Sequence, residues 1–293
     1  MKWFVCLCGM MVLLGGKAFG QQLPDSLVNK ESKHLQLPFE ADRIHVDAEG
    51  NIFLLNTGER QIYKMLALYN YDSLISIGGA SAREESLLHP IDIQSQNRQR
   101  VYVLDDVSRR LILLNINLKV LQSFEFVSEE VDIEEEEVFP IAFTLSPAGE
   151  LFVLNQWTNT ILRFSNQLNP NGEFGGTDFG QGSLFDPKAI EMDERQDIYV
   201  LDRKLQKILI YSFYGVYQYA IDLPPFWTSD KFQVQDNYIL SAEGSSFNLY
   251  HIPTRGFHQY PMDALPEILD FSSTREHFYF LTRKGIFIYQ RSS

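Results

Sequence analysis

Histidine and cysteine are the residue types with which this chain could most readily bind a metal or attack a substrate. Its histidines are His34, His45, His89, His251, His258 and His277. No two of them have the close spacing typical of zinc ligands. Both cysteines, Cys6 and Cys8, lie in an N-terminal apolar stretch, and no Ser–His–Asp or Cys–His set can be named. We therefore predict no catalytic residue, no cofactor site and no metal site.

Two further segments could bind ions, and neither has the pattern of a built site. Ser128–Glu137 (SEEVDIEEEE) is rich in carboxylates but lacks the glycine turn of a calcium loop. We interpret it as a solvated acidic loop, with a loosely bound divalent cation as the alternative. Gly172–Gly182 (GEFGGTDFGQG) lacks the Lys-Ser/Thr pair of a phosphate loop. We expect this segment to be a mobile connection.

The net charge and the N-terminal residues indicate which partners and which compartment to expect. A net charge of −13 argues against nucleic acid, which proteins bind largely through Lys and Arg, and gives no attraction to anionic lipid. Residues 1–20 combine Lys2, an apolar run and small residues at Ala18 and Gly20, which is typical of a cleaved signal peptide. We expect export to the periplasm or the extracellular space, with no membrane span after cleavage and a monomeric product.

The stretch that must position any site is Pro187–Ile210 (PKAIEMDERQDIYVLDRKLQKILI), because its pattern recurs along the chain. The same order of residues recurs from Ala41, Pro90 and Pro140: first a proline or alanine, then an aromatic residue within an apolar run, then a third apolar run. The interval is roughly 40 to 50 residues, which is typical of a β-propeller blade. Turn signals such as Glu49-Gly50-Asn51 separate the predicted strands.

These intervals predict an all-β fold: a six-bladed β-propeller of four-stranded antiparallel blades spanning residues 33–293, after a flexible lead at 21–32. The sixth unit has only three predicted strands, which would leave an exposed edge. We therefore predict that Lys33–Phe39 (KHLQLPF), whose residues alternate as in a strand, pairs with the blade that contains Phe278–Leu281 and closes the ring.

Units one to four resemble the NHL repeat. Gly50-Asn51-Ile52-Phe53 with Arg60-Gln61-Ile62-Tyr63, and Val101–Asp105 with Arg109–Ile112, carry the resemblance. It covers about Ala41–Leu223, and units five and six follow it only in spacing. The NHL glycine two residues after the proline is absent, being replaced by Asp92, Ala142 or Ala189. The resemblance implies a six-bladed propeller and leaves the function open, because this fold serves scaffolds, receptors and enzymes.

Two enzyme classes of this fold can be compared with the chain. The resemblance implies that lactonases hold a metal with Glu, Asn and Asp around the channel, the Asn and Asp at the starts of inner strands. Those starts are Pro90, Pro140 and Pro187 here, which have no ligating side chain. Amidating lyases of this fold bind zinc with several histidines, for which this chain has no matching spacing. The Asn56, Asp105, Asn155 and Asp202 series we interpret as caps for the turn backbone, with a ring of polar ligands as the alternative.

The remaining hypothesis places function on loops. In a four-stranded blade, the turns between the second and third strands and the links to the next blade emerge at one end of the ring, which we call the loop face. The residues predicted to form a binding surface there are Glu59, Asp106, Trp157, Arg203, Phe226 and Trp227. Because loop aromatics on rigid scaffolds often mediate recognition, we predict a non-enzymatic propeller that binds a protein or glycan. The alternatives are a metal-dependent lactonase or lyase and a carbohydrate-binding module.

Overall fold

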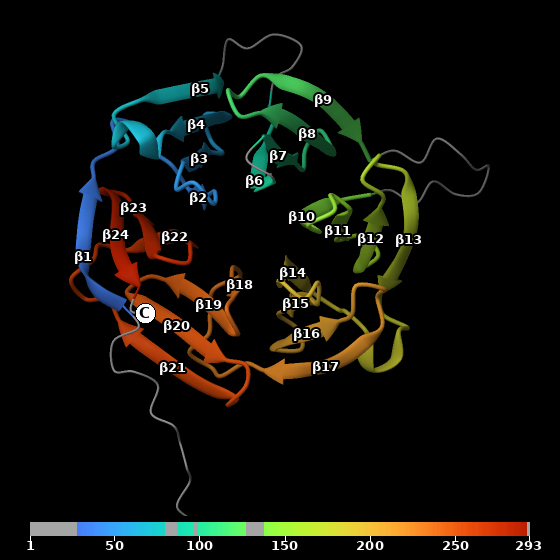
Figure 1. The fold of residues 1–293 in the computed structure, drawn as a ribbon. Coiled ribbons are helices and arrows are strands. Elements are labelled where there is room, and N and C mark those ends of the chain that lie inside the picture. The colour runs from blue at the N-terminus through green and yellow to red at the C-terminus, as the bar shows by residue number, and fades with distance from the viewer. Residues whose placement is uncertain (1–27, 80–86, 97–98, 127–137, 292–293) are drawn as a thin grey trace, which may run out of the picture.

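The computed structural model describes residues 28–79, 87–96, 99–126 and 138–291 of the chain. Within them, six four-stranded antiparallel sheets form a ring around a central channel (Figure 1). This arrangement confirms the predicted six-bladed propeller. The predicted signal peptide and the acidic run Ser128–Glu137 lie outside the described residues. No helix in the described ranges has the length and apolar character needed to cross a membrane.

Each blade runs from the channel outward in chain order, except that β1 is the outermost strand of blade 6. Blades 1 and 2 consist of β2 (Arg43–Val46), β3 (Ile52–Asn56), β4 (Gln61–Met65), β5 (Leu74–Gly78), β6 (Pro90–Gln96), β7 (Arg100–Asp105), β8 (Arg110–Asn115) and β9 (Val120–Glu125). Blades 3 and 4 consist of β10 (Pro140–Leu145), β11 (Leu151–Asn155), β12 (Thr160–Phe164), β13 (Pro170–Gly175), β14 (Pro187–Met192), β15 (Ile198–Asp202), β16 (Lys207–Tyr211) and β17 (Tyr217–Asp222). Blade 5 consists of β18 (Gln233–Gln235), β19 (Tyr238–Glu243), β20 (Ser246–His251) and β21 (Gly256–Pro261), and blade 6 of β22 (Ile268–Ser273), β23 (His277–Thr282), β24 (Gly285–Arg291) and β1 (Val28–Leu35).

The second strand of each blade is apolar because neighbouring blades cover both of its faces. Every residue of β3, β11 and β15 is buried. The outermost strands border solvent on one edge and are more polar, as in β13, where most residues are exposed. The sequence pattern of continuous apolar runs thus reflects burial on two sides.

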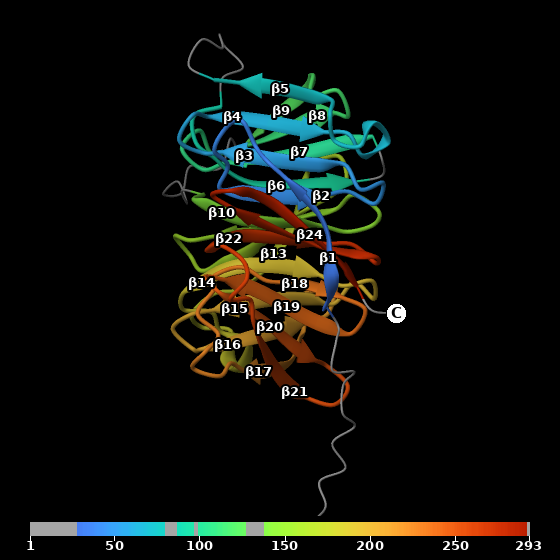
Figure 2. The ribbon, with the colours of Figure 1, turned by 90° about the vertical axis from the view of Figure 1, so that its left-hand side faces the viewer.

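The N-terminal strand closes the ring, as predicted. β1 pairs antiparallel with β24, with Val28 opposite Arg291 and Leu35 opposite Ile286. Both views show β1 beside β24 (Figures 1 and 2). The strand begins and ends earlier than the predicted Lys33–Phe39. The apolar alternation of the sequence continues to Phe39, although pairing with β24 ends at Leu35. The Phe39 ring instead stacks on Tyr63 of blade 1, with the ring centroids 3.6 Å apart.

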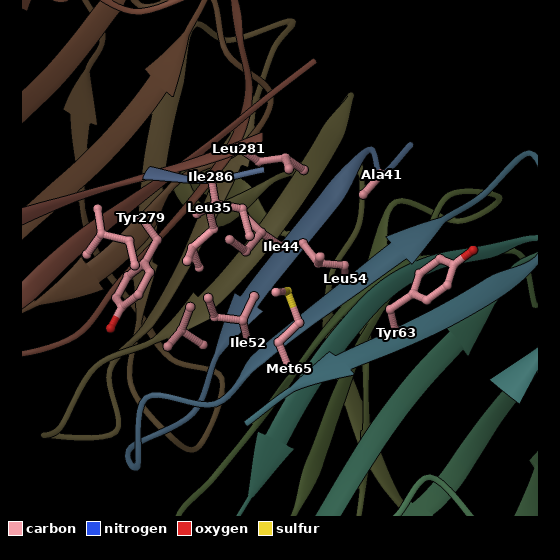
Figure 3. Close-up of a cluster of buried hydrophobic side chains, with 12 residues drawn as sticks. Leu35, Ala41, Ile44, Ile52, Leu54, Tyr63, Met65, Tyr279, Leu281 and Ile286 are labelled. Carbon is pink, nitrogen blue, oxygen red and sulfur yellow. The ribbon is translucent and has the colours of Figure 1, made fainter. Parts of the chain in front are cut away.

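A hydrophobic cluster joins the closing strand β1 to the rest of blade 6 and to blade 1. Leu35 of β1, Ile286 of β24 and Ile44 of β2 belong to one buried cluster (Figure 3). The first and last parts of the chain therefore share a core, which stabilises the ring through burial of apolar surface.

Two short 3-10 turns complete the described structure, η1 (Ala67–Tyr69) and η2 (Gly180–Gly182). The second of them lies within Gly172–Gly182, the segment predicted to connect blades 3 and 4. The first part of that segment forms the end of β13, and the buried Gly182 accepts a 2.6 Å hydrogen bond from the Tyr211 hydroxyl through its carbonyl oxygen. A buried tyrosine thus anchors the glycine-rich link to blade 4.

Candidate binding face and central channel

The loop face forms where turns and links hydrogen-bond to one another. Gln156, which follows β11, donates its N–H to the Phe139 carbonyl before β10 at 2.9 Å. Arg203, after β15, makes the same contact with Asp186 before β14 at 3.0 Å. The turn after each second strand is therefore attached to the link that enters the same blade. This confirms that the two kinds of loop emerge at one end of the ring.

The Asn and Asp residues that end the second strands fix these loops. Asp202 Oδ2 accepts the N–H groups of Phe185 and Asp186, at 2.6 and 3.0 Å, and Asp202 Oδ1 accepts that of Leu205 at 2.9 Å. Asn155 Oδ1 accepts the N–H groups of Phe139 and Trp157, at 2.9 and 3.2 Å. The interpretation of this series as backbone caps is confirmed, because the acceptor atoms are occupied by the protein's own donors.

Three of the six predicted surface residues present exposed side chains on the loop face. Glu59 is exposed in the turn after β3, Trp157 is 68% exposed in the turn after β11, and Phe226 is 37% exposed in the link to β18. Asp106 lies at the surface, but its Oδ1 is 2.7 Å from Nδ1 of His89. That contact ties the turn after β7 to the residue that precedes β6.

The other two predicted residues stabilise the propeller from within. Trp227 is only 1% exposed and belongs to the core between blades 4 and 5. Its ring packs edge-on against Phe257, with centroids 6.0 Å apart. Arg203 donates hydrogen bonds to the carbonyl oxygens of Trp227 and Ser229 and pairs with Asp230. Arg203 thus holds the link from blade 4 to blade 5, and Trp227 does not present its ring to solvent.

Trp157 is the most exposed tryptophan of the loop face, and its position is fixed by neighbours. Its ring lies against Phe139, with centroids 5.8 Å apart and the planes tilted by 38°. The guanidinium of Arg109, from the turn after β7, sits 4.0 Å from the centroid of the same Phe139 ring. The Trp157 cluster, which is these three side chains, therefore joins blades 2 and 3 and leaves most of the indole in water.

Exposed apolar side chains on this end extend over several blades. Those in its turns and links are Val107, Trp157, Phe179, Phe185 and Phe226. Lys204 Nζ lies 5.3 Å from the centroid of the Phe185 ring, so a second cation lies beside an exposed aromatic ring. The exposure of large apolar groups to water is unfavourable in free energy, and several such groups on one end of a molecule are typical of an interaction surface.

The central channel contains a cavity of about 430 Å³ lined by the innermost strands. A register comparison shows which residues border it at one level. Arg43, Asp92, Ala142, Ala189 and Asp270 each lie opposite the leucine that precedes the last residue of the second strand in their blades. Blades 1, 2 and 6 thus place charged side chains at this level. Blades 3 and 4 place only methyl groups, which leaves a recess on their side.

The charged residues at this level connect neighbouring blades. Asp270 Oδ2 accepts the N–H of Ile44 at 3.0 Å, and Arg43 Nε donates to the Ile91 carbonyl at 3.2 Å. Asp92 accepts a hydrogen bond from the backbone of Phe143. Each side chain thus contacts the inner strand of the following blade, on the edge of that strand that pairs with no other strand.

His45 lies within the ring as a neutral imidazole. Ser95 donates its backbone N–H to His45 Nε2 at 3.0 Å, so this nitrogen is unprotonated. Burial lowers the pKa of His45 to about 4, although Asp47 and Asp270 oppose the shift. The imidazole therefore serves as a hydrogen-bond acceptor between blades 1 and 2 at neutral pH.

Two channel carboxyl groups have raised pKa values. Burial raises the pKa of Asp92 to about 6, against the opposing effects of hydrogen bonds from the backbone of Ile93 and Phe143. Burial and the negative charge of Asp92 raise the pKa of Glu191 well above its usual value. Part of the Glu191 side chain nevertheless reaches the cavity. Carboxyl groups of this kind can exchange protons or bind cations near neutral pH.

These channel residues were not predicted from the sequence, because only Pro90, Pro140 and Pro187 stand at the predicted strand starts. The strand register shifts directly after each proline. As a result, the residue two positions after the proline lies opposite the leucine near the end of the second strand. The available signal was polarity: charged residues such as Asp92 and Glu191 interrupt otherwise apolar inner strands. Within the described part of the chain, no group of three or more His, Cys, Asp or Glu side chains is arranged to hold a metal ion.

Comparisons with known proteins agree on the fold. No protein-family model matches the chain, and no curated protein matches it. Among solved structures, a catalytically inactive virginiamycin B lyase from Staphylococcus aureus with quinupristin gives a TM-score of 0.57 at 11% identity, covering 88% of this chain and 87% of that one. A streptogramin B lyase gives 0.57 at 13% identity, with 85% and 78% covered.

A selenomethionine-substituted virginiamycin B lyase from Staphylococcus aureus gives a TM-score of 0.62 at 9% identity, covering 89% of this chain and 99% of that one. At such low identity these similarities establish the six-bladed propeller and leave the activity of this chain open.

Proposed function

We propose that this protein is an exported, non-enzymatic recognition propeller that binds another protein through its loop face. The observation that carries the proposal is the Trp157 cluster. Its indole is 68% exposed yet held against Phe139 and Arg109. A rigid exposed tryptophan offers a large contact area at little cost in conformational entropy, which is the usual character of an interface anchor.

A protein partner is favoured over a glycan by what surrounds the indole. Trp157 lies on the same end of the ring as Val107, Phe185 and Phe226, which are also exposed and apolar. Cations beside two of the aromatic rings would complement carboxylates of a partner. The signal-like residues 1–20 support export. The NHL-like pattern of units one to four supports the propeller scaffold and leaves its function open.

Affinity capture with matched variants tests this proposal. Trp157→Ala and Phe185→Ala should each reduce recovery of a specific partner from extracts of the source cells. Tyr214→Ala is the control, because Tyr214 is 79% exposed in the turn between β16 and β17 at the opposite end of the ring. A partner recovered equally with all three variants would contradict the assignment to the loop face. Binding to a glycan array that depends on Trp157, without a protein partner, would favour the carbohydrate-binding alternative.

A second candidate is an enzyme that acts in the central channel. The raised pKa values of Asp92 and Glu191 favour it, because carboxyl groups that titrate near neutral pH are suited to proton transfer. The metal-dependent form of this alternative does not fit the residues present, which supply Ala142 and Ala189 where ligands would be needed. Turnover of a lactone or ester panel that is lost in both Asp92→Asn and Glu191→Gln would support it.

A further inference from the structure

The charges that line the channel are almost all neutralised by partners within the protein. Among the cations, Lys231 Nζ lies 3.1 Å from Asp270 Oδ1 and Lys188 Nζ lies 2.6 Å from Asp186 Oδ1. Arg43 donates to the carbonyl oxygens of Asp42 and Ile91. The basic side chains of the cavity therefore have partners of their own.

The acidic side chains divide into two groups. Asp230 pairs with Arg203, and Glu194 pairs with Arg275 at 3.0 Å. Within the described residues, neither Asp92 nor Glu191 forms an ion pair, and Glu191 also has no hydrogen-bond donor. Both nevertheless line the cavity, deep in the ring. Burial raises the pKa of Asp92, and the charge of Arg43 opposes that rise. Within the described residues, Glu191 is therefore the carboxyl group of this cavity without a compensating cation, which is costly for a partly buried carboxylate.

The space next to the pair suits an alkyl chain. Ala189 lies two residues before Glu191 on the same side of β14, at the level where Ala142 of blade 3 also has only a methyl group. Ile141 and Met192 also line the cavity. The recess therefore combines an aliphatic wall with Asp92 at the same level and Glu191 two residues further along β14.

We propose that this recess binds the primary ammonium group of an alkylamine ligand at Glu191, with Asp92 as a further carboxyl group of the same cavity. A single positive charge fits better than a metal dication, because Arg43 and Lys231 line the same cavity and, among the described residues, no three carboxyl or imidazole groups are arranged to hold a metal ion. The inference concerns a site separate from the loop face and does not depend on the proposed function.

Calorimetry with pentylammonium tests the site, with 1-pentanol as the neutral analogue of equal chain length. The amine should bind and the alcohol should not. Glu191→Gln should weaken amine binding about tenfold or more, as expected when one member of an enclosed charge pair is removed. Glu194→Gln is the matched control, since Glu194 lines the same cavity but already pairs with Arg275. Its affinity should equal that of the unmodified protein.

Two further readouts separate binding from folding. Glu191→Gln should raise the melting temperature of the free protein, because it removes an unpartnered carboxylate, so lost binding cannot result from unfolding. Affinity should also increase as the pH rises through the raised pKa of Glu191, with protons released on binding. Equal binding of amine and alcohol, unchanged affinity in Glu191→Gln, or binding of Ca²⁺ in place of the amine would overturn the proposal.

Discussion

Asp92 of blade 2 and Asp270 of blade 6 occupy the same register position, and each accepts a backbone N–H from the inner strand of the next blade. They differ in one respect. Asp270 also pairs with Lys231 at 3.1 Å, whereas Asp92 has no ion pair within the described residues. The same structural role is therefore performed by a carboxylate with a close ion pair in one blade and by a carboxylate without one in another.

Asp92→Asn should change how stability depends on pH. Because the folded-state pKa of Asp92 is raised to about 6 from a model-peptide value of 3.8, its contribution to stability is fully present below about pH 4 and is lost as the pH rises through 6. The variant lacks this loss. Across that interval, its free energy of unfolding should therefore rise relative to that of the unmodified protein by up to about 2–3 kcal/mol. Urea unfolding at pH 4 to 7.5 measures it, with Asp263→Asn, at an exposed turn position, as a surface control. Parallel curves for the two proteins would contradict the assignment.

His45→Gln should have the opposite effect on the pH profile. The folded-state pKa of His45 is lowered to about 4 from 6.5, so its contribution is fully present above pH 6.5 and is lost as the pH falls toward 4. Relative to the unmodified protein, the variant should therefore lose less stability on acidification, by about 3 kcal/mol at most. An unchanged slope in urea unfolding between pH 6.5 and 4 would show that the imidazole is not held neutral.

Gly285→Ala should weaken ring closure. A Cβ at this position would lie 2.1 Å from the carbonyl oxygen of Leu35 in β1, and Gly285 has a φ of +125°. We expect a loss of about 2–4 kcal/mol in the free energy of unfolding. Gly172→Ala is the control: its φ is +107° but nothing lies within 4 Å, so it tests backbone strain without the clash. Equal losses in the two variants would mean that contact with β1 adds nothing.

The two loop-face tryptophans should behave differently when truncated. Trp227→Ala should cost about 3–5 kcal/mol, since it empties a core position. Trp157→Ala should change stability by about 0.5 kcal/mol or less, because the indole is mostly in water. Thermal or urea unfolding of both variants measures the contrast. A large loss in Trp157→Ala would make that residue a structural one and weaken the proposed function.

The sequence predicted the architecture well because burial on both faces of each second strand imposes apolar runs at regular intervals. The same runs contain no information on which loop aromatics fold inward. Trp157 and Trp227 both occupy loops and both pack against a phenylalanine, but Trp227 lies in the core between blades 4 and 5 whereas Trp157 is 68% exposed. The channel residues were missed for a related reason: a register shift after the prolines, which the linear pattern does not show, turns Asp92 toward the channel level.

Site-specific photo-cross-linking from position 157 tests the central claim most directly. A benzophenone amino acid replaces Trp157 in one variant and Tyr214, at the opposite end of the ring, in another. Irradiation with extracts of the source cells should give one defined protein adduct from position 157 and none of that size from 214. Excess unmodified protein should suppress the adduct, and excess Trp157→Ala should not. Equal adducts from both positions, or none from 157, would contradict recognition through the loop face.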